Sequence, residues 1–198
     1  DKLFCYTSRK IYNTDLVEIA DLSDYFPSVM FGGPLCDDPY GRYWQVTGNY
    51  VRRFVPNGLG TGELTEWSST AWTDGELPRT VWWDDFTGHI YFTLGLGQRL
   101  IKWHPDNGYA GHCDDVAIPA GWGIQSDYNY PINGKYWAAA DYDVTLVNLV
   151  TMKIERRINL LDFATTYPAH LGGTYEKFAH SAVIMTYDGM FKYPLERY

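Results

Sequence analysis

The sequence predicts an all-β protein: a β-propeller of about five blades with an incomplete last blade, or a fragment of a larger propeller. The first observation is a repeat whose segments are Leu3–Leu22, Tyr43–Ser68, Val81–His104, Tyr136–Leu160 and Ala182–Tyr198. Their starts lie 40, 38, 55 and 46 residues apart. A period of roughly 40–50 residues with several strands per unit is typical of propeller blades.

The second observation is the composition. Aromatic residues make up 17% of the 198 residues and charged residues only 20%, which provides enough apolar surface for the core of a large domain. We therefore expect one propeller domain over residues 1–198, with repeats at about 3–42, 43–80, 81–135, 136–181 and 182–198.

Each repeat consists of short runs rich in β-branched and aromatic residues, separated by Gly, Pro, Asn and Asp, and such runs predict strands joined by turns. The expected strands are, in order, LFCYT, KIYNT and LVEIADL; YWQVT, YVRRF and ELTEWS; VWWDD, HIYFT and RLIKWHP; YWAAA, VTLVN and KIERRINL; and AVIMT and MFKYP. The fifth repeat has only two of these runs. An unfinished blade exposes a sheet edge, so we expect a piece of a longer chain or a blade that a partner completes.

Two segments resemble known propeller repeats. Trp82–Asn107, WWDDFTGHIYFTLGLGQRLIKWHPDN, is similar to blades of the gluconolactonase and NHL-repeat kind, and Tyr142–Leu160, YDVTLVNLVTMKIERRINL, resembles a YncE-like blade. The resemblance implies the propeller fold. Its gluconolactonase part would also imply a divalent metal in the central channel, held by carboxylate and amide side chains, but it assigns no positions in this sequence.

The charge pattern argues against nucleic acid as a partner. The formal net charge is −8, and a nucleic-acid groove needs clustered Lys and Arg. No apolar run approaches the roughly 20 residues of a membrane span. The chain begins at Asp1 without an initiator Met, so we expect either a removed leader or a start within a longer protein.

A Cys-Asp-Asp triplet occurs at residues 36–38 and again at 113–115. The two copies begin 33 residues after the start of the first repeat and 32 residues after the start of the third, which predicts the same phase, in the connection to the next blade. Converging carboxylates suit calcium or another hard divalent cation, and the candidate ligands are Asp37, Asp38, Asp114 and Asp115. The alternative is that each Asp ends a strand and caps a turn.

A second cluster contains His104, His112 and Cys113, whose side chains suit zinc or copper. Their spacing matches no familiar metal site, so the sequence favours turn and core roles for them. Cys36 and Cys113 could form a disulfide only if the blade geometry brings them together.

Tryptophans of the first strands, such as Trp44 and Trp82, recur at matching positions, which predicts packing between blades. Trp72 and Trp122 fall in connections instead, where exposed aromatic rings beside acidic groups can bind a glycan or a protein. These two residues are the candidate ligand-binding residues.

The leading functional hypothesis is a non-enzymatic structural or interaction module of an extracellular, periplasmic or virion assembly, such as a phage tail. Its partners would be other proteins, further parts of a longer chain or further copies in an oligomer. The sequence also allows a cytoplasmic location. No nucleophile elbow or acid–base set is apparent, so an enzyme is disfavoured. The alternatives are a metal-dependent hydrolase or lactonase with its site in the central funnel, and a carbohydrate-binding, lectin-like propeller.

Overall fold

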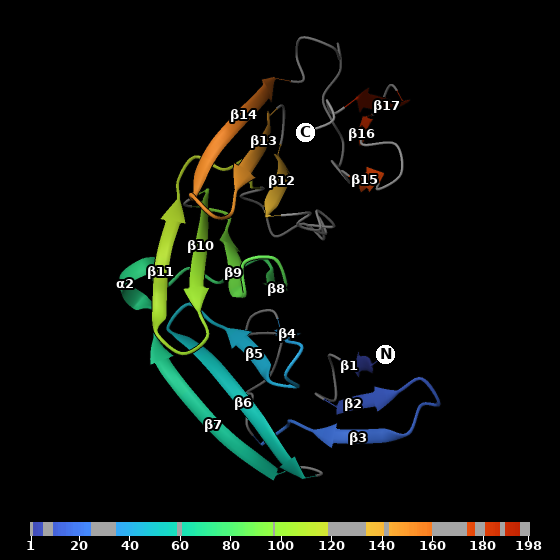
Figure 1. The fold of residues 1–198 in the computed structure, drawn as a ribbon, viewed down its shortest axis with the longest axis vertical. Coiled ribbons are helices and arrows are strands. Elements are labelled where there is room, and N and C mark those ends of the chain that lie inside the picture. The colour runs from blue at the N-terminus through green and yellow to red at the C-terminus, as the bar shows by residue number, and fades with distance from the viewer. Residues whose placement is uncertain are drawn as a thin grey trace. The chain divides into compact units, whose positions relative to one another are not determined.

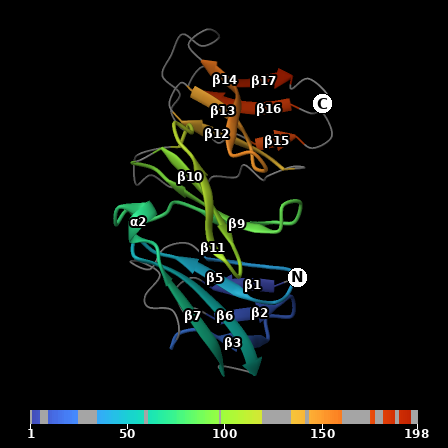
Figure 2. The same ribbon diagram turned by 60° about the vertical axis from the view of Figure 1, so that its left-hand side comes forward.

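The computed structural model describes residues 2–5, 10–24, 35–58, 61–96, 98–118, 134–140, 143–159, 174–176, 181–186 and 189–194. These residues form five antiparallel sheets, and each sheet consists of strands that follow one another in the sequence (Figure 1). Figure 2 shows the same order from a second side, with one short helix, α2 (Thr70–Thr73), after the second sheet.

The strands have the following bounds. The first sheet contains β1 (Lys2–Cys5), β2 (Lys10–Asn13) and β3 (Glu18–Asp21), and the second contains β4 (Leu35–Asp37), β5 (Tyr43–Val46), β6 (Tyr50–Gly58) and β7 (Thr61–Ser68). The third contains β8 (Val81–Asp84), β9 (His89–Leu94), β10 (Arg99–His104) and β11 (Gly108–Cys113). The fourth contains β12 (Lys135–Ala140), β13 (Asp143–Asn148) and β14 (Lys153–Asn159), and the fifth contains β15 (Thr174–Glu176), β16 (Ser181–Thr186) and β17 (Gly189–Pro194).

Two inner strands, β9 and β13, are buried on both faces, whereas β14, the last strand of its sheet, has an exposed face. Five of the six residues of β9 and four of the six residues of β13 are buried. In β14, by contrast, exposed and half-buried residues alternate, as the two-residue period of a strand requires when only one face is covered. Neighbouring parts of the chain therefore cover both faces of β9 and β13.

The second and fifth sheets begin one strand earlier than the sequence indicated. Residues 36–38 were expected in a connection, but Cys36 and Asp37 lie in β4, which pairs with β5 through Cys36↔Trp44 and Asp37↔Tyr43. Likewise β15 precedes β16 and pairs with it. A strand of three residues is too short to show a recognisable sequence pattern. It forms because it pairs with the strand that follows it, β5 for β4 and β16 for β15.

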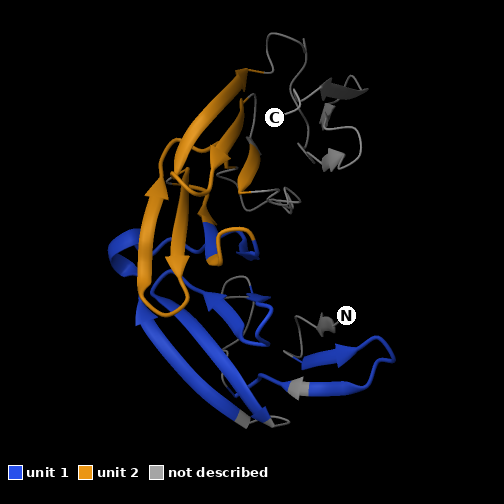
Figure 3. Cartoon of the chain, viewed as in Figure 1, with its two compact units in different colours: residues 1–85, 90–92 blue, residues 86–89, 93–198 orange. Residues whose placement is uncertain are grey.

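The chain divides into two compact units, which Figure 3 distinguishes by colour. The first comprises Asp1–Asp85 and Ile90–Phe92, and the second comprises Phe86–His89 and Thr93–Tyr198. Each unit holds buried contacts between consecutive sheets. In the first unit, Ile11 and Leu22 of the first sheet region pack with Tyr43, Phe54 and Leu35 of the second.

In the second unit, polar contacts join the third and fourth sheet regions. Lys102 Nζ of β10 donates a hydrogen bond to the Leu149 carbonyl at 3.1 Å. The Ala117 N–H donates to Thr145 Oγ1 of β13 at 3.0 Å. Both contacts satisfy polar groups at positions where the two sheet regions meet. Within the described part of the chain, no helix has the length and apolar character needed to cross a membrane.

Candidate functional site

The β4–β5 hairpin turns around a buried carboxylate. Asp38 Oδ1 accepts hydrogen bonds from the backbone N–H groups of Tyr40 and Arg42 at 2.9 and 3.1 Å. Asp38 Oδ2 accepts from Arg42 Nε at 2.5 Å and from Trp44 Nε1 at 2.9 Å. An Asp that binds the backbone two residues ahead forms an Asx turn, and this one also uses its second oxygen. Both oxygens of Asp38 are therefore engaged within the hairpin.

This turn presents Tyr40 to solvent. Tyr40 is 74% exposed, and the guanidinium of Arg42 lies over its ring, 5.0 Å from the centroid. The same guanidinium lies 5.6 Å from the ring centroid of the buried Trp44. The Arg42 side chain therefore contacts the exposed Tyr40 ring, and its charge is paired with that of Asp38.

The neighbouring strand β8 adds a second aromatic ring. The Trp83 ring meets Tyr40 edge to face, with centroids 6.0 Å apart and planes at 87°. This is a favourable geometry for an aromatic pair. Trp83 Nε1 also donates a hydrogen bond to the exposed Asp85 Oδ1 at 2.8 Å.

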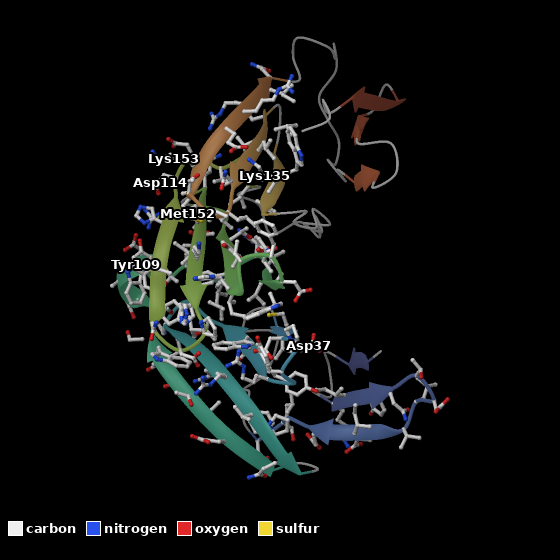
Figure 4. The ribbon with its side chains drawn as sticks, viewed as in Figure 1. Asp37, Tyr109, Asp114, Lys135, Met152 and Lys153 are labelled. Carbon is white, nitrogen blue, oxygen red and sulfur yellow. The ribbon has the colours of Figure 1, made fainter. Side chains whose placement is uncertain are left out.

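We call Asp37, Tyr40, Arg42, Trp83 and Asp85 the Tyr40–Trp83 site. All five residues belong to the first unit. Asp37 is exposed, and Figure 4 marks its position on β4. Residues 35–43 contain two Asp and one Arg, and residues 81–85 contain two Asp, so the two segments carry −1 and −2, or −3 together. The site thus combines the exposed Tyr40 ring and the half-buried Trp83 ring with acidic residues.

The two hairpins of this site repeat each other. LCDDPYGRYW of β4–β5 corresponds to WWDDFTGHIY of β8–β9, and the turn glycines Gly41 and Gly88 both have positive φ, 77° and 66°. The left-handed region is accessible to Gly at little cost. This match identifies residues 36–38 as the counterpart of residues 83–85, not of residues 113–115.

The two Cys-Asp-Asp copies are therefore not equivalent, contrary to the sequence prediction. The first copy lies on the first strand of the second sheet, whereas Cys113 ends β11, the last strand of the third sheet. Asp37 and Asp38 belong to the first unit and Asp114 and Asp115 to the second. Among the described residues, no group of three or more His, Cys, Asp and Glu side chains is placed to hold a metal ion. The calcium site stays a prediction.

Asp114 takes part in a chain of polar contacts on one face of β10 and β11 (Figure 4). Its Oδ1 accepts a hydrogen bond from Arg99 Nε at 2.9 Å, and its Oδ2 lies 3.3 Å from His112 Nε2. The other ring nitrogen of His112 shares a hydrogen bond with the Tyr109 hydroxyl. Burial, with Asp114 adding to the effect, raises the pKa of the Tyr109 phenol. Asp115 differs, since Arg157 donates to its backbone carbonyl.

A β-bulge brings Tyr109 and His112 to the same face. In the β10–β11 register Lys102 pairs with Gly111 and Trp103 with Tyr109, so Ala110 is the extra residue. Residues three apart on a regular strand would point to opposite faces, and the inserted residue reverses this.

The predicted His104, His112 and Cys113 cluster does not assemble. His104 Nδ1 accepts the backbone N–H groups of Asp106 and Asn107, both at 3.1 Å, so His104 caps its turn, as the favoured interpretation expected. Cys113 follows His112 on the strand and points to the opposite face, where its thiol contacts the Asp114 carbonyl at 3.7 Å.

Cys36 and Cys113 are both free, so the disulfide between them is not formed. Burial raises the pKa of the Cys113 thiol. Burial, reinforced by the carboxylates of Asp37 and Asp38, raises the pKa of the Cys36 thiol well above its usual value. A thiol that resists ionisation is a poor nucleophile and a poor metal ligand.

The tryptophans divide between packing and the site. Trp44 is buried and stacks with Trp67, with centroids 6.0 Å apart, and Trp82 stacks with Tyr91 at 5.6 Å. Trp72, a predicted ligand residue, is half-buried in α2, and Trp122 lies outside the described residues. Tyr40 is the most exposed of the aromatic residues that the structure describes, and the sequence reasoning missed it. The Asp-Asp-x-x-Gly pattern that residues 37–41 share with residues 84–88 could have drawn attention to its turn.

Comparisons with known proteins identify the fold. No protein-family model matches the chain, and no curated protein matches it. Among solved structures, a streptogramin B lyase has a TM-score of 0.58 at 14% identity, with 96% of this chain and 63% of that chain covered. YCF48 bound to a D1 peptide has a TM-score of 0.58 at 12% identity, with 98% and 60% covered.

A protein of unknown function from Bacteroides caccae gives a TM-score of 0.58 at 15% identity, with 93% of this chain and 66% of that chain covered. The chain thus spans about three fifths to two thirds of the length of these neighbours. Their identities are too low to carry an activity across, but they agree with the five consecutive antiparallel sheets. The chain has a β-propeller fold, as the repeats in the sequence predicted.

Proposed function

We propose that this chain is a non-enzymatic propeller module that binds another protein through the Tyr40–Trp83 site. The observation that carries the proposal is the exposed ring of Tyr40, which packs at 87° to the Trp83 ring and lies on a turn that the buried Asp38 holds through backbone hydrogen bonds. Tyr, Trp and Arg are enriched at protein interfaces, and rigid aromatic rings supply contact area at low entropic cost. A ring kept exposed on a rigid turn fits such a role.

A structural neighbour supports the choice of a protein partner. YCF48 is described as bound to a D1 peptide, so a propeller of this general shape can bind a polypeptide. We extend this only to the class of partner, because a propeller fold alone does not specify function. An extracellular, periplasmic or virion assembly remains the setting that we propose, supported by the acidic and aromatic-rich composition.

The two alternatives gain no specific support from the described residues. A hydrolase that uses Asp38 as a metal ligand would have to break the Asp38 contacts with Arg42 and Trp44. A lectin site at Trp72 would need a fully presented ring, and Trp72 is half-buried. Both alternatives stay predictions, testable by metal titration and by a glycan array.

The proposal is tested by selecting short random peptides from a display library on the immobilised chain. Fluorescence anisotropy then measures the affinity of the enriched peptides for the wild type and for Tyr40→Ala. We expect Tyr40→Ala to weaken binding at least about tenfold, or about 1.4 kcal/mol. Tyr50→Ala is a matched control, because Tyr50 is 39% exposed and also lies against an arginine, Arg52, at 5.2 Å. Failure to enrich any peptide, or equal losses for both variants, would overturn the proposal.

A further inference from the structure

We infer that the Tyr40–Trp83 site recognises a positively charged side chain of its partner, with arginine preferred over lysine. This inference rests on the proposed function, because it names the chemistry of the partner for the same site. It follows from three features: the exposed carboxylates of the site, the angle between its two aromatic rings, and the negative net charge of the whole chain.

The charge available at the site is negative. Its cation, Arg42, is paired with Asp38 at 2.5 Å, and its side chain is only 16% exposed. Asp37 and Asp85 are exposed, and the donor that hydrogen-bonds Asp85 is the neutral indole of Trp83. The carboxylates can therefore take up an incoming cation, whereas Arg42 is already neutralised.

The rings suit a planar cation. The Arg42 guanidinium already lies within cation–π distance of the Tyr40 ring, and arginine makes such contacts with aromatic faces more readily than lysine does. Because the planes of the Tyr40 and Trp83 rings lie at 87° to each other, the pair forms a corner instead of a closed stack. A guanidinium in that corner would meet a ring face and a carboxylate together, and its fork of N–H groups matches a carboxylate in two bonds. The compact ammonium of lysine offers only the point charge.

The rest of the chain reinforces this preference. The formal net charge of −8 creates a field that attracts cationic partners and speeds their association at low salt. An acidic peptide would meet both this field and the free carboxylates of Asp37 and Asp85. Charge complementarity therefore selects a basic segment as the occupant.

The experiment uses the peptide of highest affinity from the selection described above. Each of its arginines is replaced in turn by citrulline, which keeps the shape of the side chain and removes its charge, and then by lysine. We expect one citrulline to weaken binding about tenfold, with lysine intermediate. On the protein side, Asp37→Asn and Asp85→Asn should each weaken the arginine peptide and leave the citrulline peptide unchanged, as a double-mutant cycle requires for a direct contact.

Asp15→Asn is the matched control, since Asp15 is an exposed acid of the same unit, in the β2–β3 turn. Thermal melting of each variant confirms that it is folded. Three outcomes overturn the inference: enriched peptides that lack arginine and lysine, citrulline peptides that bind as well as the parent, or equal effects of Asp15→Asn and Asp37→Asn. If such peptides still lose affinity with Tyr40→Ala, only the inference fails, whereas the absence of any binding peptide removes the proposed function as well.

Discussion

Asp37 and Asp38 are neighbours in the chain but have opposite surroundings. Asp38 is 5% exposed and accepts hydrogen bonds from two backbone N–H groups, a guanidinium and an indole. Asp37 is exposed. Successive side chains of extended backbone point to opposite sides, so one Asp organises the turn while the other is left at the surface. A metal site would instead use both carboxylates.

Asp38→Ala should lower the free energy of unfolding by about 3 kcal/mol, because it leaves Arg42 and Trp44 without their buried acceptor. Asp37→Ala should change it by less than about 0.5 kcal/mol, as expected for an exposed position. Urea unfolding of both variants measures the difference.

Repeating this unfolding with added CaCl2 also tests the predicted calcium site. If calcium stabilised the wild type and Asp37→Ala abolished that gain, the metal prediction would be supported and the purely structural interpretation of the pair would be wrong. Asp15→Ala provides the exposed-acid control in both series.

The Cys36 thiol is expected to make the free energy of unfolding depend on pH in the alkaline range. Its pKa is raised above the ordinary value of 9.0 by burial and by two carboxylates, so above that pH the unfolded chain loses a proton that the folded chain keeps. Stability is then highest below about pH 9 and falls as the pH rises. Between pH 7.5 and about pH 9.5 we expect Cys36→Ala to lose less unfolding free energy than the wild type. Equal losses in the two proteins would show that the Cys36 thiol does not contribute.

At the scale of elements, hydrogen bonds connect α2 and the preceding Ser69 to the β5–β6 turn. The Thr73 hydroxyl donates to the Gly48 carbonyl, the Ser69 N–H donates to the Asn49 carbonyl at 2.8 Å, and Ser69 Oγ donates to the Thr47 carbonyl at 3.3 Å. A helix of four residues cannot be stable alone. These contacts with the turn therefore determine where it forms.

Gly48→Ala should disrupt the packing of the α2 region against the β5–β6 turn. A Cβ at Gly48 would lie 2.3 Å from the Gly75 carbonyl oxygen and 2.8 Å from its carbon, and backbone atoms cannot move aside as a flexible side chain would. We expect a loss of about 1–3 kcal/mol, typical of overpacking, measured by thermal unfolding. Thr70→Ala, at an exposed position of the same helix, should be close to neutral. A neutral Gly48→Ala would mean that the helix can shift away from the turn.

At the scale of the whole molecule, consecutive strands form each sheet, and in the first unit the first and second sheet regions share buried side chains. The whole sequence contains 24 acidic and 16 basic residues. The chain should therefore not retain a short DNA duplex in a gel-shift assay at about 50–200 mM salt, the range over which phosphate contacts weaken steeply. A salt-sensitive shift would show a basic surface that the composition hides.

The sequence alone predicted the fold class, and the structural neighbours confirm it. Strand and turn signals are local, and their repetition every 38 to 55 residues identifies consecutive sheets. The burial of Trp44 was also anticipated, but the matching positions were wrong: Trp44 lies on β5, the second strand of its sheet, whereas the half-buried Trp82 lies on β8, the first strand of the next. The Cys-Asp-Asp triplets misled the sequence reasoning, since equal spacing from two repeat starts does not show on which strand each copy lies.

Only the tertiary structure decided the candidate site. Tyr40 and Trp83 are far apart in the sequence and meet because β4 and β8 are the first strands of neighbouring sheets. Nothing local distinguishes the buried Asp38 from the exposed Asp37, or reveals that Ala110 bulges and turns Tyr109 toward His112. Periodicity specifies elements through short-range preferences, whereas a site depends on the register and packing of strands that are distant along the chain.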